Sequence, residues 1–243
     1  MPKTLLSLCI ATLLLSLSMN AQADHHEAKS GKKPEKETGF TPLLGDDAEK
    51  LWVGYNKKTW PEHWKLADGV LHRAGGGGDI VTVEKFENFD FRFEWKISEG
   101  GNSGVLYHVG LGDNQPYFTG MEYQILDHTK HSDGKSDLTS AAALYAMYPA
   151  NKKVVKPVGE WNTSRIVVAG NRIEHWLNGK KIVDAVRDGD EWNRRLKASK
   201  FATWEKFAKN REGHIALQDH GDLVWYRNMR IKKLPAEEMK KAG

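Results

Sequence analysis

Apolar and polar side chains alternate through much of the chain, and the clearest case lies at 89–97, which reads FDFRFEWKI. Its odd positions are all apolar, and its even positions are all charged. Successive side chains of a strand point to opposite faces, so strict alternation over this length predicts a half-buried strand in an antiparallel sheet.

Shorter segments with strand-like composition follow, separated by glycine-containing turns, at 104–109, 165–169, 172–177, 214–219 and 223–231. Asn178-Gly179 is a typical tight-turn pair, and with the turn at Gly170-Asn171 it predicts a three-stranded meander over 163–184. Gly221-Asp222 predicts that the last two segments pair with each other.

One segment has helical spacing instead. In 197–209, Phe201, Trp204 and Phe207 form a stripe that a short helix would direct into the core. Many short strands with a single helix predict an all-β fold, a two-sheet sandwich or jelly roll.

The two ends of the chain differ from this pattern. Residues 1–23 carry a basic start, an apolar run and a small-residue end, which predict a signal peptide cleaved after Ala23. We expect a disordered linker at 24–38, one domain at 39–235 and a flexible tail at 236–243. This arrangement predicts a periplasmic or secreted protein, without a membrane span.

Composition narrows the chemistry. The single cysteine, Cys9, lies in the predicted leader, which excludes disulfides, cysteine nucleophiles and thiolate metal sites from the mature chain. The net charge of +4 is small and much of it lies near the ends, so no nucleic-acid groove is expected. Nine tryptophans suit a carbohydrate ligand, but ordinary core packing explains them equally well.

The stretch 120–128, GMEYQILDH, concentrates candidate chemistry. Glu122 and Gln124 should share one strand face, whereas Asp127 joins them only if a bulge interrupts the strand near Ile125-Leu126. The alternative is that these residues are solvated polar groups on the outside of a sheet.

Taken together, five segments resemble one known family: GGDIVT, FDFRFEWKISEGGNSGVLYHV, GMEYQILDH, KPVGEWNTSRIVVAGNRIEHWLNG and GHIALQDHGDLVWYRNMRI. The chain is similar to the 3-keto-disaccharide hydrolase domain family, formerly a domain of unknown function, over essentially the whole predicted domain. The resemblance implies a concanavalin A-like jelly roll, usually exported, acting on glycosides with a ketone at carbon 3. A separate sugar 3-dehydrogenase would supply such a substrate.

A ketone at carbon 3 acidifies the hydrogen on carbon 2, so cleavage by elimination and hydration needs a base, an enolate stabiliser and a leaving-group acid. The catalytic candidates are Glu122, Asp127, His175 and His220. The substrate-binding candidates are Gln124, Tyr107, Lys156, Glu160, Gln218, Asp219 and Arg73.

Several of these have an equally simple structural interpretation: His175 as a core histidine, Asp219 as a turn cap and Lys156 as a surface lysine. Whether Asp127, His128, Asp219 or His220 holds a divalent metal stays undecided from the sequence, although no metal-binding motif is present. Two rival functions also stay open, a lectin-like carbohydrate-binding module and a conventional glycosidase using Glu122 and Asp127.

Overall fold

The computed structural model describes residues 37–150 and 154–235. The predicted signal peptide, nearly all of the predicted linker and the predicted tail lie outside the described residues.

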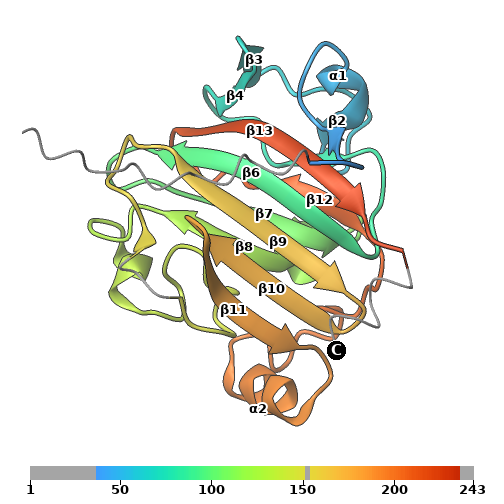
Figure 1. The fold of residues 1–243 in the computed structure, drawn as a ribbon, viewed down its shortest axis with the longest axis vertical. Helices are drawn as coiled ribbons and strands as arrows, with labels where there is room; N and C mark the ends of the chain where they lie inside the picture. Colours follow the sequence, from blue (N-terminus) through green and yellow to red (C-terminus); the bar gives the residue numbers. More distant parts are fainter. Residues whose placement is uncertain (1–36, 151–153, 236–243) are drawn as a thin grey trace, which may run out of the picture. The chain divides into compact units, whose positions relative to one another are not determined.

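Two antiparallel sheets form the fold (Figure 1). The larger, called sheet A here, has the strand order β11-β10-β9-β6-β13-β4-β3, with β1 beside β13. Its strands are β1 (Thr41–Pro42), β3 (Trp64–Ala67), β4 (Val70–Arg73), β6 (Phe89–Ile97), β9 (Asn162–Ala169), β10 (Arg172–Leu177), β11 (Lys180–Val186) and β13 (Val224–Lys233).

The smaller sheet, called sheet B, has the order β2-β5-β12-β7-β8. Its strands are β2 (Trp52–Gly54), β5 (Ile80–Thr82), β7 (Asn102–Val109), β8 (Met121–Leu126) and β12 (His214–Leu217). The helical elements are α1 (Ala48–Leu51), η1 (Pro116–Phe118), η2 (Ser132–Lys135) and α2 (Asp190–Ala198).

The core lies between the sheets. The apolar positions of β6 are all buried and face side chains from sheet B; the Phe93 ring, for example, meets Tyr123 edge-on with centroids 5.5 Å apart. Burying each such ring contributes roughly 1.5–3 kcal/mol relative to exposure. These features confirm the all-β, concanavalin A-like jelly roll expected from the alternating pattern.

Local turn chemistry is also confirmed. Asn178 and Gly179 have φ values of 47° and 77°, the left-handed values that a tight primed turn requires, and β9, β10 and β11 form the expected meander.

The helix lies earlier than expected. It spans Asp190–Ala198, with acidic residues in its first turn and basic residues in its last, as the helix dipole favours. Residues 199–209 form successive turns instead. The reason is the stacking of Phe201 on Phe207, with centroids 3.8 Å apart, because residues six positions apart on a helix point about 120° away from each other.

The expected pairing of the last two strands is wrong. β12 pairs with β5 and β7 in sheet B, whereas β13 pairs with β6, β4 and β1 in sheet A. The chain crosses between the sheets at 218–223, where the carboxylate of Asp219 binds Arg73 and that of Asp222 accepts from the amide of Asn102. Residues close in sequence are thus anchored to different strands.

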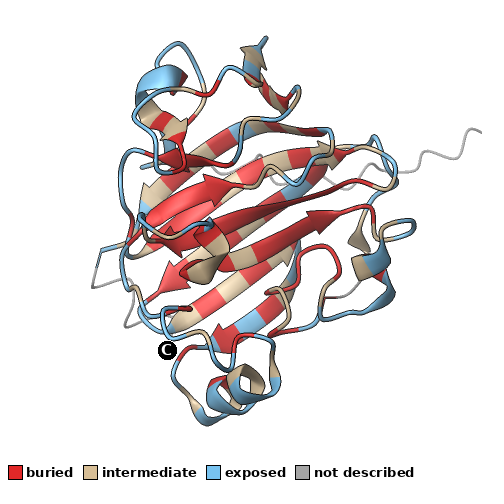
Figure 2. Cartoon of the chain, turned by 180° about the vertical axis from the view of Figure 1, so that it is seen from behind, coloured by how far each residue is buried: buried red, intermediate tan, exposed pale blue. Residues whose placement is uncertain are grey.

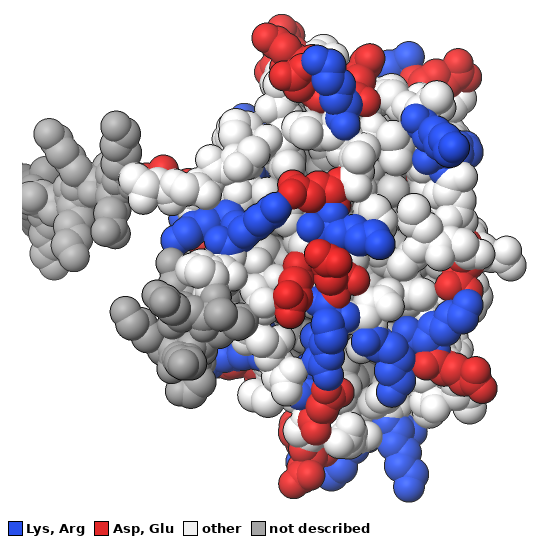
Figure 3. Space-filling view, turned by 90° about the vertical axis from the view of Figure 1, so that its right-hand side faces the viewer, with Lys and Arg blue, Asp and Glu red and all other residues white. Residues whose placement is uncertain are grey.

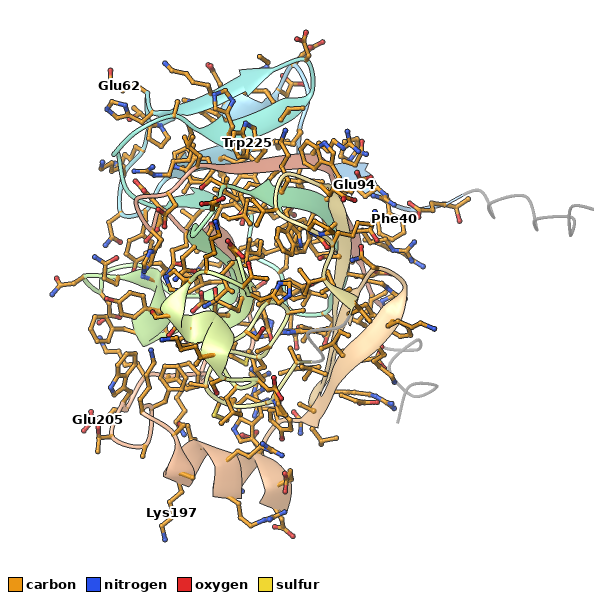
Figure 4. The ribbon with its side chains drawn as sticks, turned by 90° about the vertical axis from the view of Figure 1, so that its left-hand side faces the viewer. Phe40, Glu62, Glu94, Lys197, Glu205 and Trp225 are labelled. Atoms are coloured by element: carbon orange, nitrogen blue, oxygen red, sulfur yellow. The ribbon has the colours of Figure 1, made fainter. Side chains whose placement is uncertain are left out.

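The outer face of sheet A carries paired charges. Asp90 binds Arg92 and Arg165, and Glu94, labelled in Figure 4, binds Arg227. Figure 3 shows both signs interspersed on one side of the molecule. Within the described part of the chain, no helix is long and apolar enough to cross a membrane.

Candidate active site

The outer face of sheet B forms the floor of a cavity. Tyr123 and Ile125 of β8 point into the core, so Glu122 and Gln124 point outward. They lie opposite Leu106 and Gly104 of β7 in an unbroken register. In Figure 2, which views the molecule from behind, the strands of this sheet are coloured mostly as buried.

The cavity has a volume of about 430 Å³, within the range of small-molecule sites. Its lining combines carboxylates, amides, aromatic rings and one lysine: Asp79, Asn102, Gln115, Tyr117, Glu122, Gln124, Asp133, Tyr145, Lys200, Phe201, Gln218, Asp219 and His220. Five residues singled out from the sequence meet here, namely Glu122, Gln124, Gln218, Asp219 and His220.

Glu122 has the properties of a proton-transfer group. Burial raises the pKa of its carboxyl to about 8; Lys200 opposes this rise, and the Asp79 and Asp133 carboxylates add to it. Among the described residues, no hydrogen-bond donor contacts this carboxyl. At neutral pH roughly one molecule in ten carries the ionised form. Both protonation states are therefore accessible near neutrality, as acid–base catalysis requires.

Space for the Glu122 carboxyl depends on Gly104, on the neighbouring strand. A Cβ atom added at Gly104 would overlap with this carboxyl group, whose Cδ lies 3.0 Å from the added atom. Glycine at this position therefore fixes where the carboxyl can lie.

Three further lining residues come from loops, and the sequence did not identify them. The Tyr145 hydroxyl donates to Asp133 Oδ2 at 3.0 Å, and Lys200 Nζ lies 4.3 Å from the centroid of the Tyr145 ring. The Tyr145 amide donates to the Glu122 carbonyl, which holds this loop against β8. Burial lowers the pKa of Lys200, and attraction to Glu122 and Asp133 opposes that shift. Lys200 is thus a cation that interacts electrostatically with the Glu122 carboxyl.

Asp219 and Arg73 stabilise one end of the cavity. The Asp219 carboxylate accepts from Arg73 and from the amides of Gly78 (2.9 Å) and Gly221 (3.1 Å). Its own amide donates to Asp79 Oδ1 at 2.7 Å. Burial raises the pKa of Asp79 to about 6; the hydrogen bond from Asp219 opposes this rise, and the Asp219 charge adds to it. Arg73 therefore acts through Asp219 and does not line the cavity.

Two lining amides have buried oxygens without a partner. Asn102 Oδ1 and Gln218 Oε1 accept no hydrogen bond from the described residues. Gln124 Oε1 accepts from the amide of Ile125. Both oxygens are closed off from solvent, where an unpaired acceptor is costly.

Asp127 does not join Glu122 and Gln124, because the β7–β8 register has no bulge. Its carboxylate accepts from the amides of Gly100 and Thr129 at 2.9 Å and from the Thr129 hydroxyl at 2.5 Å. Burial tends to raise the pKa of Asp127, but these hydrogen bonds together hold it below its usual value. Asp127 thus organises the turn after β8.

His175 and Tyr107 lie in the core between the sheets. The Tyr107 hydroxyl is 3.0 Å from His175 Nε2, and His175 Nδ1 is 3.1 Å from the carbonyl oxygen of Ala142. Burial lowers the pKa of His175 to about 4, although backbone hydrogen bonds at Ala142 and Ala143 oppose the shift. The neutral ring then donates through Nδ1 and accepts through Nε2.

Lys156 and Glu160 lie elsewhere, with Asp127 and His128, around a separate cavity of about 10 Å³ that holds at most one water. Lys156 Nζ donates to the Trp161 carbonyl. No group of three or more acidic, histidine or cysteine side chains within residues 37–150 and 154–235 is arranged to hold a metal ion.

A jelly-roll sandwich whose cavity is lined by carboxylates, amides and aromatic rings is typical of a carbohydrate-active protein. Comparison with known proteins identifies the family. Residues 39–232 match the family described as the 3-keto-alpha-glucoside-1,2-lyase-like domain. A 3-keto-disaccharide hydrolase of Bacteroides thetaiotaomicron is 34% identical over 240 residues, covering 86% of this chain and 83% of the relative.

Solved structures agree. A candidate glycosyl hydrolase from Parabacteroides distasonis matches with a TM-score of 0.74 and 34% identity, covering 81% of this chain and 94% of that one. A second candidate glycosyl hydrolase from the same organism matches with a TM-score of 0.67 and 30% identity. The match covers 80% of this chain and 99% of that one. The chain belongs to the 3-keto-alpha-glucoside-1,2-lyase-like domain family and is a glycoside-cleaving enzyme, which confirms the family expected from the sequence.

Proposed function

We propose that this enzyme cleaves the glycosidic bond of 3-keto glycosides or disaccharides, with the reaction centred on Glu122. The observation that carries the proposal is the raised pKa of Glu122 in a cavity that also holds the Lys200 cation. The relative from Bacteroides thetaiotaomicron, a 3-keto-disaccharide hydrolase, supports the substrate class.

In the proposed reaction, ionised Glu122 removes the proton from carbon 2. The C–H electrons form the C2=C3 double bond, and the carbonyl oxygen becomes an enolate whose charge Lys200 stabilises. The enolate then reforms the carbonyl, C1=C2 forms, and the aglycone oxygen leaves carbon 1 with a proton from Glu122. Water adds to carbon 1 while carbon 2 regains a proton, so the net reaction is hydrolysis.

Asn102, Gln124 and Gln218 would hold the sugar hydroxyls in this scheme. All three residues line the cavity and carry amide groups that can pair with hydroxyls. The exposed His220 lines the same cavity, and Glu122 carries the chemistry in this scheme.

The proposal extends to cellular context. The predicted signal peptide favours an exported enzyme, periplasmic or secreted. A separate sugar 3-dehydrogenase must then oxidise the substrate before cleavage, because an unoxidised glycoside lacks the acidic hydrogen at carbon 2.

The test compares a 3-keto glucoside with its unoxidised parent in heavy water. We expect cleavage of the ketone alone, with deuterium at carbon 2 of the released keto sugar beyond a no-enzyme control. Cleavage of the parent without labelling would support a conventional glycosidase, which never breaks that C–H bond. Binding of both compounds without turnover would support a lectin-like module.

A further inference from the structure

The cavity has two chemically different ends along the direction of β7. At the start of β7, Asn102 lies beside Gln218, whose amide donates to the Gly104 carbonyl at 2.9 Å. Asp79, Asp219 and His220 line the same end, because β12 ends and β5 begins there. This end, called the polar end here, carries the carboxylates of Asp79 and Asp219 and the side-chain amides of Asn102 and Gln218.

The other end is aromatic. Gln115 and Tyr117 belong to the connection between the end of β7 and the start of β8, about seven residues or some 23 Å along the strand from Asn102. Phe201 reaches the same end from the loop after α2, since the Ala208 amide donates to Thr119 at 2.9 Å and Trp204 contacts the Tyr117 ring. In Figure 4, Glu205 marks this loop.

The reactive group lies between the two ends. Glu122 faces Leu106, near the middle of β7, and two separate connections, which carry Tyr145 and Lys200, border it there. A substrate whose scissile bond reaches Glu122 therefore spans both ends, with its keto sugar on one side and its leaving group on the other.

We propose that the keto sugar occupies the polar end and that the leaving group lies against Tyr117, which selects leaving groups with a flat apolar face. This inference rests on the proposed function. The polar end offers most of the hydrogen-bonding groups that the ring hydroxyls need, and the opposite end offers the aromatic carbon of Tyr117 and Phe201. An aryl group and the C–H face of a second sugar ring both present this chemistry.

Tyr117 is held ready for such a contact. It sits in the 3₁₀ turn η1, where the Gly120 amide and the Thr119 hydroxyl donate to the Pro116 carbonyl at 2.9 and 3.2 Å. The Thr119 hydroxyl also accepts from the Gly110 amide at 2.9 Å. Because the turn is fixed before binding, little conformational entropy is lost when a leaving group packs on the ring.

The test measures kcat/KM for three 3-keto glucosides, with phenyl, glucosyl and methyl leaving groups, in the wild type and in Tyr117→Ala. We expect a loss of about fivefold to tenfold for the phenyl or glucosyl substrate, the value of one aromatic contact, and less than twofold for methyl. A loss of kcat/KM for the phenyl substrate alone identifies an aryl leaving group. A loss for the glucosyl substrate alone identifies a second sugar as the leaving group.

Matched controls separate the ring from the fold. Tyr117→Phe keeps the ring, and Phe118→Leu changes the same turn at a residue that does not line the cavity; both should keep the wild-type preference. If Tyr117→Ala fails to fold, Tyr117→Leu replaces it. An equal loss for all three substrates, or no loss for any, overturns the inference.

A binding measurement keeps this inference apart from the reaction. Calorimetric titration with phenyl glucoside, a glucose disaccharide and methyl glucoside should show the same Tyr117-dependent preference without turnover. If the wild type cleaves no keto glucoside, the proposed function fails, and these titrations still decide the role of Tyr117. If wild type and Tyr117→Ala bind all three glucosides equally well, the proposed role of Tyr117 is wrong.

Discussion

Replacing Glu122 with glutamine should strongly reduce turnover and make the protein more stable at high pH. The substitution keeps nearly the same shape but removes the ionisable group. Since Glu122 transfers the proton in the proposed reaction, we expect kcat to fall by about 10²-fold or more. The change in stability follows from the pKa of the buried carboxyl.

Burial raises this pKa from 4.5 to about 8, so the folded state holds a proton that the unfolded state releases. The stability linked to that proton is fully present below pH 4.5 and is lost as pH rises through about 8. At 1.36 kcal/mol per pKa unit the full shift corresponds to about 5 kcal/mol. Glu122 borders an open cavity, and screening by water should reduce the difference to about 2–3 kcal/mol.

The assay is urea unfolding of both proteins from pH 5 to pH 9. The free energy of unfolding should be similar at pH 5, and the glutamine variant should become the more stable protein by pH 9. Asp127→Asn is the matched control: it should lose stability through the turn after β8 yet retain turnover within about threefold. Parallel pH curves for wild type and Glu122→Gln would refute the reasoning.

Other substitutions probe the surroundings of this carboxyl. Gly104→Ala should displace the Glu122 carboxyl and lower kcat by about 10-fold or more, while circular dichroism stays unchanged; normal turnover would contradict the packing argument. Lys200→Met should lower kcat about 10²-fold and Lys200→Arg much less, because only the first removes the charge near the enolate; equal losses would point to packing. The His175 ring should stay neutral down to pH about 4, so an NMR titration midpoint near 6.5 would show that it is not buried as described.

Local patterns predicted much of the fold. Alternation in β6 and the Asn178-Gly179 turn depend on neighbouring residues alone, and both are confirmed. Strand partners depend on distant residues. The crossing between β12 and β13 is anchored by Arg73 and Asn102, far earlier in the chain, and no local pattern indicates it.

The candidate site also has a part that local patterns predicted and a part that they did not. Glu122 and Gln124 could be paired from sequence because strand geometry places alternate residues on one face. Asp133, Tyr145 and Lys200 reach the cavity from loops, and short-range periodicity carries no information about where a loop folds back. The sequence offers one signal for Lys200, its position directly before the aromatic stripe that begins at Phe201. Without the fold this signal does not show whether the lysine reaches the cavity.

The sequence by itself thus determined the main strands from β6 onward, the all-β class, the family and one face of the site, because each depends on side-chain alternation, turn residues or a series of local segments. Only the tertiary structure decided that Asp127 and His175 lie away from the cavity while Lys200 lies in it. It also decided that the pKa of Glu122 is raised further than that of Asp79, because a pKa depends on burial and on charges that distant parts of the chain bring together.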